Sequence, residues 1–299
     1  MARRRAFFGL MTVVFAALAQ GATPAAEAID MTGKTAFVTG STSGLGEVVA
    51  RRLGAMGATV IVHGLDESRG RAIAAEITAA GPGRATFEPG DLASVAAVRR
   101  LAARVRAGHP RLHLLVNNAG VLGRTDAPRR VSKDGHELTF AVNHLAHFVV
   151  TRELLPQIEA AAPARIVNVA SGAQTPIHFD DVMLTRDYAS GTAYAQSKLA
   201  QVMFTFALAE QLDPKKVTVN TLHPATMMNT PMVVDNGITP RSSVEDGANA
   251  VMQLAVGRAL TGRTGLYFNQ LNEARANAQA YDAAARKRLW DLSVALTQE

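Results

Sequence analysis

Residues 34–46 read KTAFVTGSTSGLG, an apolar run that leads directly into a glycine-rich turn. The run Thr35–Thr39 has the β-branched and aromatic composition of a buried strand, and glycines follow it at positions 40, 44 and 46. Between a strand and a helix, such a turn lets backbone N–H groups and the positive end of the helix approach the pyrophosphate of a dinucleotide. Taken alone, the pattern is equally compatible with an ordinary tight turn.

Beyond this turn, short apolar runs alternate with longer helical patterns. This alternation predicts an α/β fold, a single Rossmann-type doubly wound domain with a mostly parallel seven-stranded sheet. The expected strands are Thr35–Thr39, Thr59–His63, Arg84–Glu88, Leu112–Asn117, Arg165–Ala170, Lys216–Leu222 and Gly265–Phe268, and helical patterns include Val95–Val105, Gly135–Ala161 and Thr192–Leu212.

The segments between these elements are predicted from their turn residues. Gly123–Pro128 and Gln174–Gly191 are expected to be loops, and Met227–Pro240 is expected to be a mobile lid over the substrate. Asn272–Gln298 has helical composition with a single Trp, and it is expected to pack back on the domain.

The composition excludes several kinds of site. The chain has no cysteine, which excludes disulfides, cysteine nucleophiles and thiolate metal ligands. No group of His, Asp and Glu has metal-ligand spacing, so no metal is expected. The net charge is +6, and residues 29–299 carry +4 of it because residues 1–28 hold three arginines and one glutamate. This is an ordinary solvated surface, and no nucleic-acid partner is expected.

Residues 1–28 differ from the rest of the chain. Arg3–Arg5 precede an apolar stretch of 14 residues, Ala6–Ala19, and then a segment rich in small residues, Gln20–Ala28. A membrane span needs about 20 residues, so the pattern favours a cleaved export signal, and Arg4–Phe8 resembles a twin-arginine signal. We therefore expect residues 29–299 to be the Rossmann-type domain, exported to a periplasmic or other extracytoplasmic space. A membrane anchor, a transit peptide and a cytoplasmic location are the alternatives.

Four polar residues in the second half of the chain form a pattern suited to proton transfer. Tyr194 and Lys198 lie four residues apart in a helical stretch and so share a face, Ser171 ends a strand, and Asn143 lies on the preceding helix. A free tyrosine has a pKa of about 10, and lowering it by about 3 units requires roughly 4 kcal/mol. A cation about 4 Å away at an effective dielectric constant near 20 supplies an interaction of that order. Alone, Tyr194 and Lys198 would be better explained as a surface pair.

Together these features resemble the short-chain dehydrogenase/reductase family over residues 34–268. The resemblance rests on TGxxxGxG at 39–46, Asp91, the NNAG run at 117–120, and the set formed by Asn143, Ser171, Tyr194 and Lys198. Within the family, the sequences NHLAHF at 143–148 and YAQSKLA at 194–200, together with the 23-residue step from Ser171 to Tyr194, are similar to the retinol-dehydrogenase-like members.

The resemblance implies an NAD(P)-dependent oxidoreductase that moves a hydride between the cofactor and an alcohol, aldehyde or ketone, with a lipophilic small-molecule substrate. It implies that Tyr194 is the general acid/base, helped by Lys198, Ser171 and Asn143, and that Asn143 holds a water near the lysine. Asp91 would meet the adenine, and Asn117 would steady the central strand. The expected cofactor contacts are Thr39, Gly40, Ser41, Ser43, Gly44, Leu45, Gly46, Gly64, Leu65, Asp91, Leu92, Asn118, Ala119, Gly120, Tyr194, Lys198 and Pro224.

The choice between the two nicotinamide cofactors depends on the end of the second strand. Gly64 stands where an acidic residue would hold the ribose of NAD, and Leu65 stands where NADP-using relatives often carry Arg. The missing acid favours NADP over NAD, whereas the missing Arg weakens this preference. Ser41, His63 and Arg69 are the candidate phosphate contacts. A non-catalytic dinucleotide sensor or scaffold and a sugar-nucleotide epimerase are the alternative functions, and a homo-oligomer is left open.

Three other features have simpler interpretations. His144 and His147 are expected to be structural residues of a packed helix. Met227, Met228 and Met232 could form either an apolar lip over the substrate or ordinary core. Relatives usually have Pro-Gly where this chain has Pro224–Ala225, and alanine is expected to restrict the backbone there.

Overall fold

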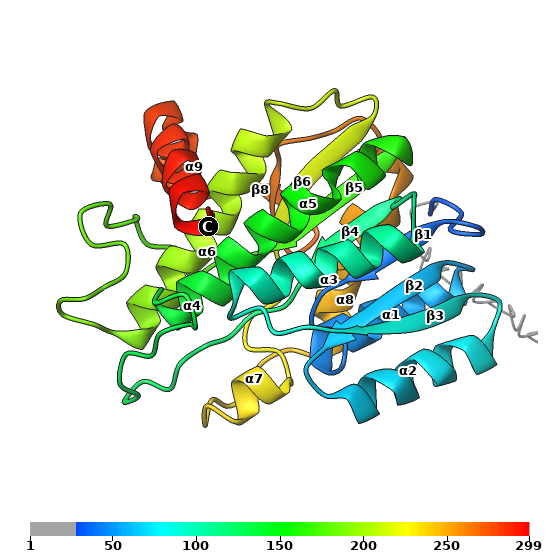
Figure 1. Cartoon of the computed structure of the whole chain (residues 1–299), viewed down its shortest axis with the longest axis horizontal. Coiled ribbons are helices and arrows are strands. Elements are labelled where there is room, and N and C mark those ends of the chain that lie inside the picture. Colours follow the sequence, from blue (N-terminus) through cyan, green and yellow to red (C-terminus); the bar gives the residue numbers. More distant parts are fainter. Residues whose placement is uncertain (1–27, 299) are drawn as a thin grey trace, which may run out of the picture.

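The computed structural model describes residues 28–298, which fold around one eight-stranded sheet with the order β3-β2-β1-β4-β5-β6-β7-β8 (Figure 1). All neighbouring strands pair in parallel except β8, which is antiparallel to β7. The strands are β1 (Thr35–Val38), β2 (Thr59–Gly64), β3 (Arg84–Pro89), β4 (Leu114–Asn117), β5 (Ala164–Val169), β6 (Val217–His223), β7 (Tyr267–Asn269) and β8 (Asn272–Ala274).

The seven predicted strands are all present, but the predicted strand count is wrong because β8 was assigned to a helical segment. Asn269 pairs with Asn272, so β7 and β8 are joined by a two-residue turn in which Gln270 has a φ of 56°. A three-residue edge strand after such a turn has too few residues to show an alternating pattern, and the sequence therefore hides it.

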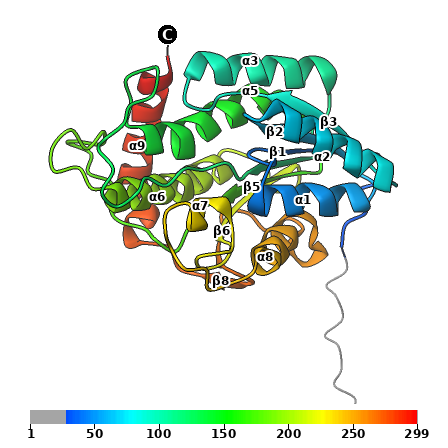
Figure 2. The same ribbon diagram turned by 90° about the horizontal axis from the view of Figure 1, so that it is seen from below.

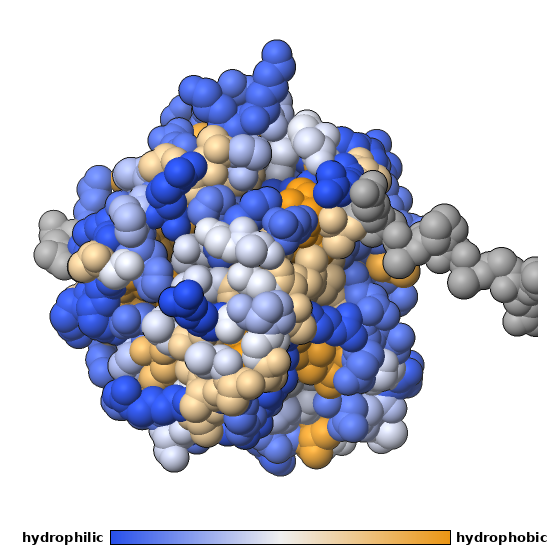
Figure 3. Space-filling view, turned by 90° about the vertical axis from the view of Figure 1, so that its right-hand side faces the viewer, coloured by the Kyte–Doolittle hydropathy of each residue, from blue (hydrophilic) through white to orange (hydrophobic). Residues whose placement is uncertain are grey.

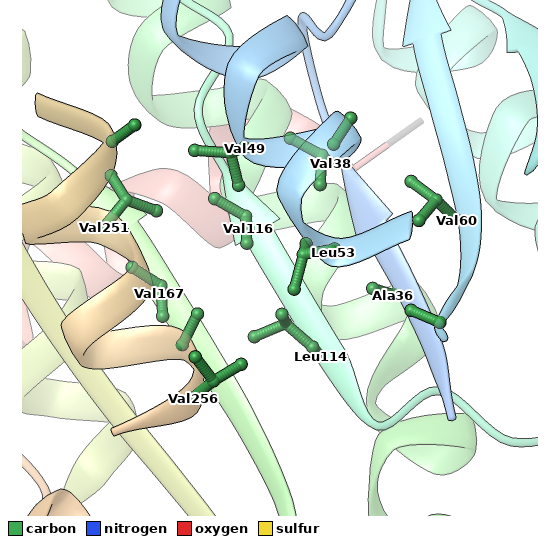
Figure 4. Packing of buried hydrophobic residues seen from close by; sticks show 14 of the residues in the cluster. Ala36, Val38, Val49, Leu53, Val60, Leu114, Val116, Val167, Val251 and Val256 are labelled. Carbon is green, nitrogen blue, oxygen red and sulfur yellow. The ribbon is translucent and has the colours of Figure 1, made fainter. Parts of the chain in front are cut away.

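Helices cover both faces of the sheet, as a doubly wound fold requires (Figure 2). One face packs against α1 (Gly44–Ala55), α2 (Glu67–Ala80) and α8 (Val244–Val256), and the other against α3 (Val95–Gly108), α5 (Ala146–Ala160) and α6 (Ser190–Ala209). The first core layer is seen in Figure 4, where Val49 and Leu53 of α1 and Val251 of α8 lie over alternate residues of the central strands.

The predicted helix Gly135–Ala161 is divided into three parts. It begins with α4 (Leu138–Phe140), because the Glu137 carboxylate accepts a hydrogen bond from the Phe140 N–H and caps its first turn. A π-helical segment, η1 (Ala141–Leu145), follows and leads into α5. Single π turns of this kind often occur at functional sites, and this one contains Asn143.

The C-terminal segment packs on the domain as predicted. Helix α9 (Ala283–Thr297) lies against α6, and Trp290 contacts the rings of Phe148 and Phe204. His144 is buried among these rings and its Nε2 lies 2.7 Å from the Ser293 hydroxyl of α9. The structural role expected for His144 is therefore confirmed, since it joins α9 to the π-helical segment.

The segment predicted as a lid, Met227–Pro240, contains a short helix, α7 (Pro231–Val234), with no buried residue. Smaller one-turn helices are η2 (Arg258–Leu260) and η3 (Ala278–Tyr281). On the face drawn in Figure 3, hydrophilic residues dominate and apolar residues form small separate groups. None of the helices within residues 28–298 is both long and apolar enough to cross a membrane. The predicted export signal lies outside the described residues, and the boundary at residue 28 stays a prediction.

Buried histidines should make the fold sensitive to acid. Burial lowers the pKa of His144 from 6.5 to about 3, so this ring stays neutral in the folded chain and is protonated on unfolding. Its contribution to stability is complete above pH 6.5 and is lost as the pH falls towards 3, by up to about 1.4 kcal/mol per pH unit. We expect His144→Leu to show a smaller fall in the free energy of unfolding between pH 6.5 and pH 4, measured by urea denaturation.

The control variant is His178→Leu, which makes the same substitution at an exposed position. Equal slopes for His144→Leu and the wild type would show that the buried ring does not contribute to acid unfolding.

Candidate functional site

The sequence-predicted site residues come together at one edge of the sheet. The turn at residues 39–46 follows β1, Gly64 ends β2, Asp91 follows β3, residues 118–120 follow β4, and Ser171 follows β5. In the strand order, β1 lies beside β4, and the chain leads from β1 to β2 on one side and from β4 to β5 on the other. Ligands of open α/β sheets bind outside the strand ends at such a reversal point.

The glycine-rich turn fits closely against the loop that follows β4. A Cβ added at Gly40, whose φ is 62°, would lie 2.8 Å from the Cα of Ala119. A Cβ added at Gly46 would overlap the carbonyl oxygen of Gly40 and lie 2.5 Å from Nδ2 of Asn118. Gly40 and Gly46 are therefore needed so that the turn can bend back onto this loop.

Thr39 and Asn118 join the two loops by hydrogen bonds. The Thr39 hydroxyl accepts from the backbone N–H groups of Asn118 and Ala119 at 2.9 and 3.0 Å, and the Asn118 amide donates to the carbonyls of Thr39 and Gly40. Since both loops are held in one arrangement before any ligand arrives, the site is largely preformed.

The residues present fit a dinucleotide. Ser43 precedes α1 without capping it, so its side chain makes no hydrogen bond to the N–H groups at the positive end of this helix. The glycines beside it leave the backbone open to a pyrophosphate, which this helix end would hold. Leu65, at the end of β2, is 73% exposed. After β3, the Asp91 carboxylate accepts a hydrogen bond from the Ala93 N–H at 2.9 Å and lies 3.4 Å from Lys133 Nζ.

Three candidate phosphate contacts do not have the expected placement. Ser41 is fully buried, and its hydroxyl donates to the Val38 carbonyl and accepts from the His63 N–H. The ring of His63 is 2% exposed and has hydrogen-bond partners at both nitrogens. Arg69 donates to the Glu47 carboxylate at 2.7 Å. The side chains of Ser41 and His63 therefore form hydrogen bonds on the buried side of the turn, and neither is available to a phosphate.

The hydroxyls of Ser171 and Tyr194 interact although the two residues belong to different elements. Ser171 follows β5 and Tyr194 lies in the first turns of α6. Burial raises the pKa of the Tyr194 hydroxyl, and the hydrogen bond with Ser171 acts in the opposite direction. The four-residue spacing predicts that Lys198 lowers the pKa of Tyr194. In the structure, Lys198 is not among the groups that shift this pKa.

The reason lies in where the Lys198 ammonium points. Lys198 is 3% exposed, and its Nζ donates to the Val169 carbonyl at 2.9 Å and to Oε1 of Gln201 at 2.8 Å. Nζ also lies 5.6 Å from the centre of the Tyr194 ring. Because no carboxylate accompanies this cation, burial lowers the pKa of Lys198 to about 7.

The Asn143 side chain has protein partners at both of its amide atoms. Its amide is fully buried and is bonded to both backbone groups of Val121 and to the Ser197 hydroxyl at 2.9 Å. These bonds use both amide hydrogens and one of the two lone pairs of Oδ1, so the expected water contact of Asn143 stays a prediction. The side chain also fixes the loop after β4 against the helix that carries Tyr194.

Two residues of the site were missed as functional candidates. Gln201 bonds Lys198 through Oε1, while its Nε2 lies 3.1 Å from Nδ1 of His147. The other nitrogen of His147 lies 3.2 Å from the Thr39 hydroxyl. A continuous buried network therefore joins Lys198 to the glycine-rich turn. The three-residue step from Lys198 to Gln201 places both on one helix face, and this spacing could have revealed the pair.

The backbone restriction expected at Ala225 stays a prediction, and the structure shows where the residues around the lid lie. Ala225 is buried with an ordinary backbone, and the left-handed conformation occurs at Met227, which has a φ of 49°. Met228 packs against the core, Met227 is 39% exposed, and the methyl of Met232 approaches Gly120. The three methionines are therefore divided between core and site.

Comparison with known proteins agrees with this geometry. A family model described as short chain dehydrogenase matches residues 34–239. The chain belongs to the short-chain dehydrogenase family. Human retinol dehydrogenase 14 is 33% identical over 291 residues, covering 88% of this chain and 86% of that protein. Human retinol dehydrogenase 13 is 35% identical over 283 residues, covering 88% and 84%.

Solved structures give the same result. An uncharacterized protein from Mycobacterium paratuberculosis has a TM-score of 0.74 and 30% identity over 91% of this chain and 96% of that chain. A Pseudomonas aeruginosa RhlG/NADP active-site complex has a TM-score of 0.66 and 27% identity over 80% of this chain and 95% of that chain. This short-chain dehydrogenase is therefore an NAD(P)-dependent oxidoreductase that acts on alcohols or carbonyls, and it is similar to the retinol dehydrogenases.

The close fit at Gly46 predicts a specific loss of nucleotide binding. Gly46→Ala forces a methyl group against Gly40 and Asn118, so we expect a loss of about 1–3 kcal/mol of stability and a dissociation constant for NADPH raised at least about tenfold. Gly108→Ala is the matched control, since it also lies in a helix and its added Cβ meets nothing within 4 Å. Similar NADPH affinities in both variants would contradict the close fit.

The bond between Gln201 and Lys198 predicts a pH effect. With a pKa of about 7, Lys198 loses its charge as the pH rises through neutrality, and we expect NADPH binding to weaken there. Gln201→Glu places a carboxylate beside Nζ, which favours the ammonium and raises this pKa. The decline in NADPH affinity should therefore begin at a higher pH than in the wild type, as measured by titration between pH 6 and pH 10. Superimposable pH profiles would rule out this role for Gln201.

Proposed function

We propose that this enzyme catalyses NADP(H)-dependent interconversion of a lipophilic alcohol and its aldehyde or ketone, with Tyr194 as general acid/base. The observation that carries the proposal is the meeting of Ser171 and Tyr194 at the strand ends, with the Lys198 ammonium 5.6 Å from the centre of the tyrosine ring. Each of these groups has a separate task in moving one proton.

In the reducing direction, the Tyr194 hydroxyl gives its proton to the substrate oxygen as that oxygen gains negative charge. Ser171 donates a hydrogen bond to the same oxygen and keeps it within reach of the tyrosine. The bound nicotinamide supplies the hydride for reduction and accepts it for oxidation. In the oxidising direction, Tyr194 takes the proton from the alcohol as a phenolate.

A phenolate in a buried place requires a positive charge nearby. Burial alone raises the pKa of Tyr194, which makes it a better acid than base. The Lys198 ammonium donates to two neutral acceptors, and neither of these hydrogen bonds neutralises its charge. We propose that this unneutralised charge stabilises the phenolate and positions the ribose of the cofactor.

Two observations support a lipophilic substrate. Met227 is 39% exposed and Val234 is 50% exposed on the segment that lies beside the glycine-rich turn, where Thr230 approaches Gly44. The similar proteins named retinol dehydrogenases act, by their name, on an apolar alcohol. An apolar rim next to the turn would favour substrates of this kind.

The preference for NADP over NAD rests on what is missing beside β2. Gly64 and the exposed Leu65 place no carboxylate at the strand end to repel a 2′-phosphate. The similar RhlG structure is an NADP complex. Both observations favour NADP, and direct comparison of NADPH and NADH as reductants tests it.

The mechanism predicts a variant that binds the cofactor but does not turn over. Tyr194→Phe removes only the hydroxyl, so we expect the NADPH dissociation constant to stay within about threefold while kcat falls by at least about 100-fold with a long-chain aldehyde. Tyr188→Phe is the control, because it removes a hydroxyl from the same region, six residues earlier in the chain. Substantial activity in Tyr194→Phe would refute the assigned acid/base. Tight NADPH binding by the wild type without turnover of any aldehyde, ketone or alcohol would indicate a non-catalytic sensor.

A further inference from the structure

His63 occupies an unusual position at the carboxyl end of β2. In the sheet, β2 lies between β1 and β3, so a side chain at its end can reach the loops that follow both neighbours. The ring does so. Its Nδ1 accepts from the backbone N–H of Gly40 at 3.1 Å, and its Nε2 lies 3.1 Å from the carbonyl oxygen of Gly90.

These two contacts require one protonation state of the ring. A backbone N–H can only donate, so Nδ1 must carry a lone pair, and a carbonyl can only accept, so Nε2 must carry the hydrogen. The ring is 2% exposed, and burial lowers the pKa of His63 to about 4. The neutral form that the geometry demands is therefore the form that burial favours.

The charged groups around the ring favour the same state. Arg104 of α3 acts on His63 as a nearby positive charge, although it is itself paired with Glu88 of β3 at 2.8 Å. His147 of α5, on the other side of β1, is also buried, and burial lowers its pKa to about 3. The edge of the Phe37 ring packs against the imidazole with centroids 6.0 Å apart. Surroundings of this kind keep the ring neutral and in one orientation.

We infer that His63 is a positioning residue for the dinucleotide site, a neutral imidazole that fixes the distance between the glycine-rich turn and the segment that begins at Gly90. This inference rests on the proposed nucleotide site. Gly40 belongs to the turn that would hold the pyrophosphate, and Asp91, next to Gly90, is the expected adenine contact. One ring therefore sets the spacing of two parts of the site that are far apart in the sequence.

The geometry also explains why the ring must remain intact. A Cβ added at Gly90 would lie 3.2 Å from Nε2 of His63, so the backbone there comes close to the ring because glycine has no side chain. A smaller residue at position 63 would leave the Gly40 N–H without its acceptor in a partly buried place. A donor without a partner there is unfavourable, and the turn can find another partner only by moving.

The test compares three variants by NADPH titration, using the fluorescence of the nucleotide at pH 7. His63→Ala removes both contacts, and we expect its NADPH dissociation constant to rise about tenfold. His63→Asn restores an acceptor where Nδ1 stood, so it should recover most of that loss. His113→Ala is the matched control, because Nδ1 of His113 accepts from the Thr35 N–H at 3.0 Å at the opposite end of β1.

His113→Ala should lower the melting temperature and leave the NADPH dissociation constant within about twofold of the wild type. An unchanged dissociation constant in His63→Ala, or an equal loss in both alanine variants, would overturn the inference and leave the proposed function intact. Failure of the wild type to bind NADPH or NADH would overturn the proposed function and the inference with it.

The ring itself gives a second measurement that needs no variant to fold. The ¹⁵N chemical shifts of His63 in the wild-type protein should be those of the tautomer with hydrogen on Nε2 at pH 7. A ring with hydrogen on Nδ1, or a protonated ring, could not accept from Gly40 and would overturn the inference.

Discussion

The parallel pairing of β1 with β4 is the constraint on which the site depends. Because the chain turns away in opposite directions after these two strands, the helices that follow them leave the space outside their carboxyl ends to loops, which the segment with α7 approaches through Thr230 and Met232. The glycine-rich turn and the NNAG segment face each other there, and the Thr39 hydroxyl holds them together through the N–H groups of Asn118 and Ala119. Every other feature of the site is built around these two loops.

A buried cation without a carboxylate partner is the second organising feature. Removing an ammonium from water is costly, and in Lys198 this cost appears as a pKa lowered to about 7. The surrounding acceptors, Val169 and Gln201, are neutral, so they orient the charge without cancelling it. The proposed mechanism uses this charge to stabilise the Tyr194 phenolate, a role that a lysine paired with a carboxylate would fill less well.

The C-terminal helix contributes to the site from a distance. Trp290 and Ser293 of α9 pack against Phe148 and His144, which lie on either side of the junction between the π-helical segment and α5. The same segment carries Asn143, whose amide bridges Val121 and Ser197. Because these contacts are continuous, α9 supports the orientation of the loop after β4 and of α6 although it does not reach the strand ends.

Much of the fold and of the candidate site could be predicted from the sequence because the deciding patterns are local. Continuous apolar runs identify strands buried on both faces, and the glycine spacing, the NNAG segment and the step from Tyr194 to Lys198 each lie within one element or turn. The order of these elements was sufficient to bring the site residues to one edge of the sheet. The edge strand β8 could not be predicted, because a three-residue strand after a two-residue turn is too short to show an alternating pattern.

Only the tertiary structure decided which partners the polar side chains choose. Ser41 and His63 have side chains that could bind a phosphate, yet both point inward. There they form hydrogen bonds with backbone groups near the turn that would otherwise lack partners. Lys198 lies one helical turn from Tyr194, but its ammonium points towards its two hydrogen-bond acceptors, Val169 of β5 and Gln201 of α6. Sequence spacing fixes which residues can meet on one helix face, whereas contacts between elements far apart in the chain depend on how those elements pack.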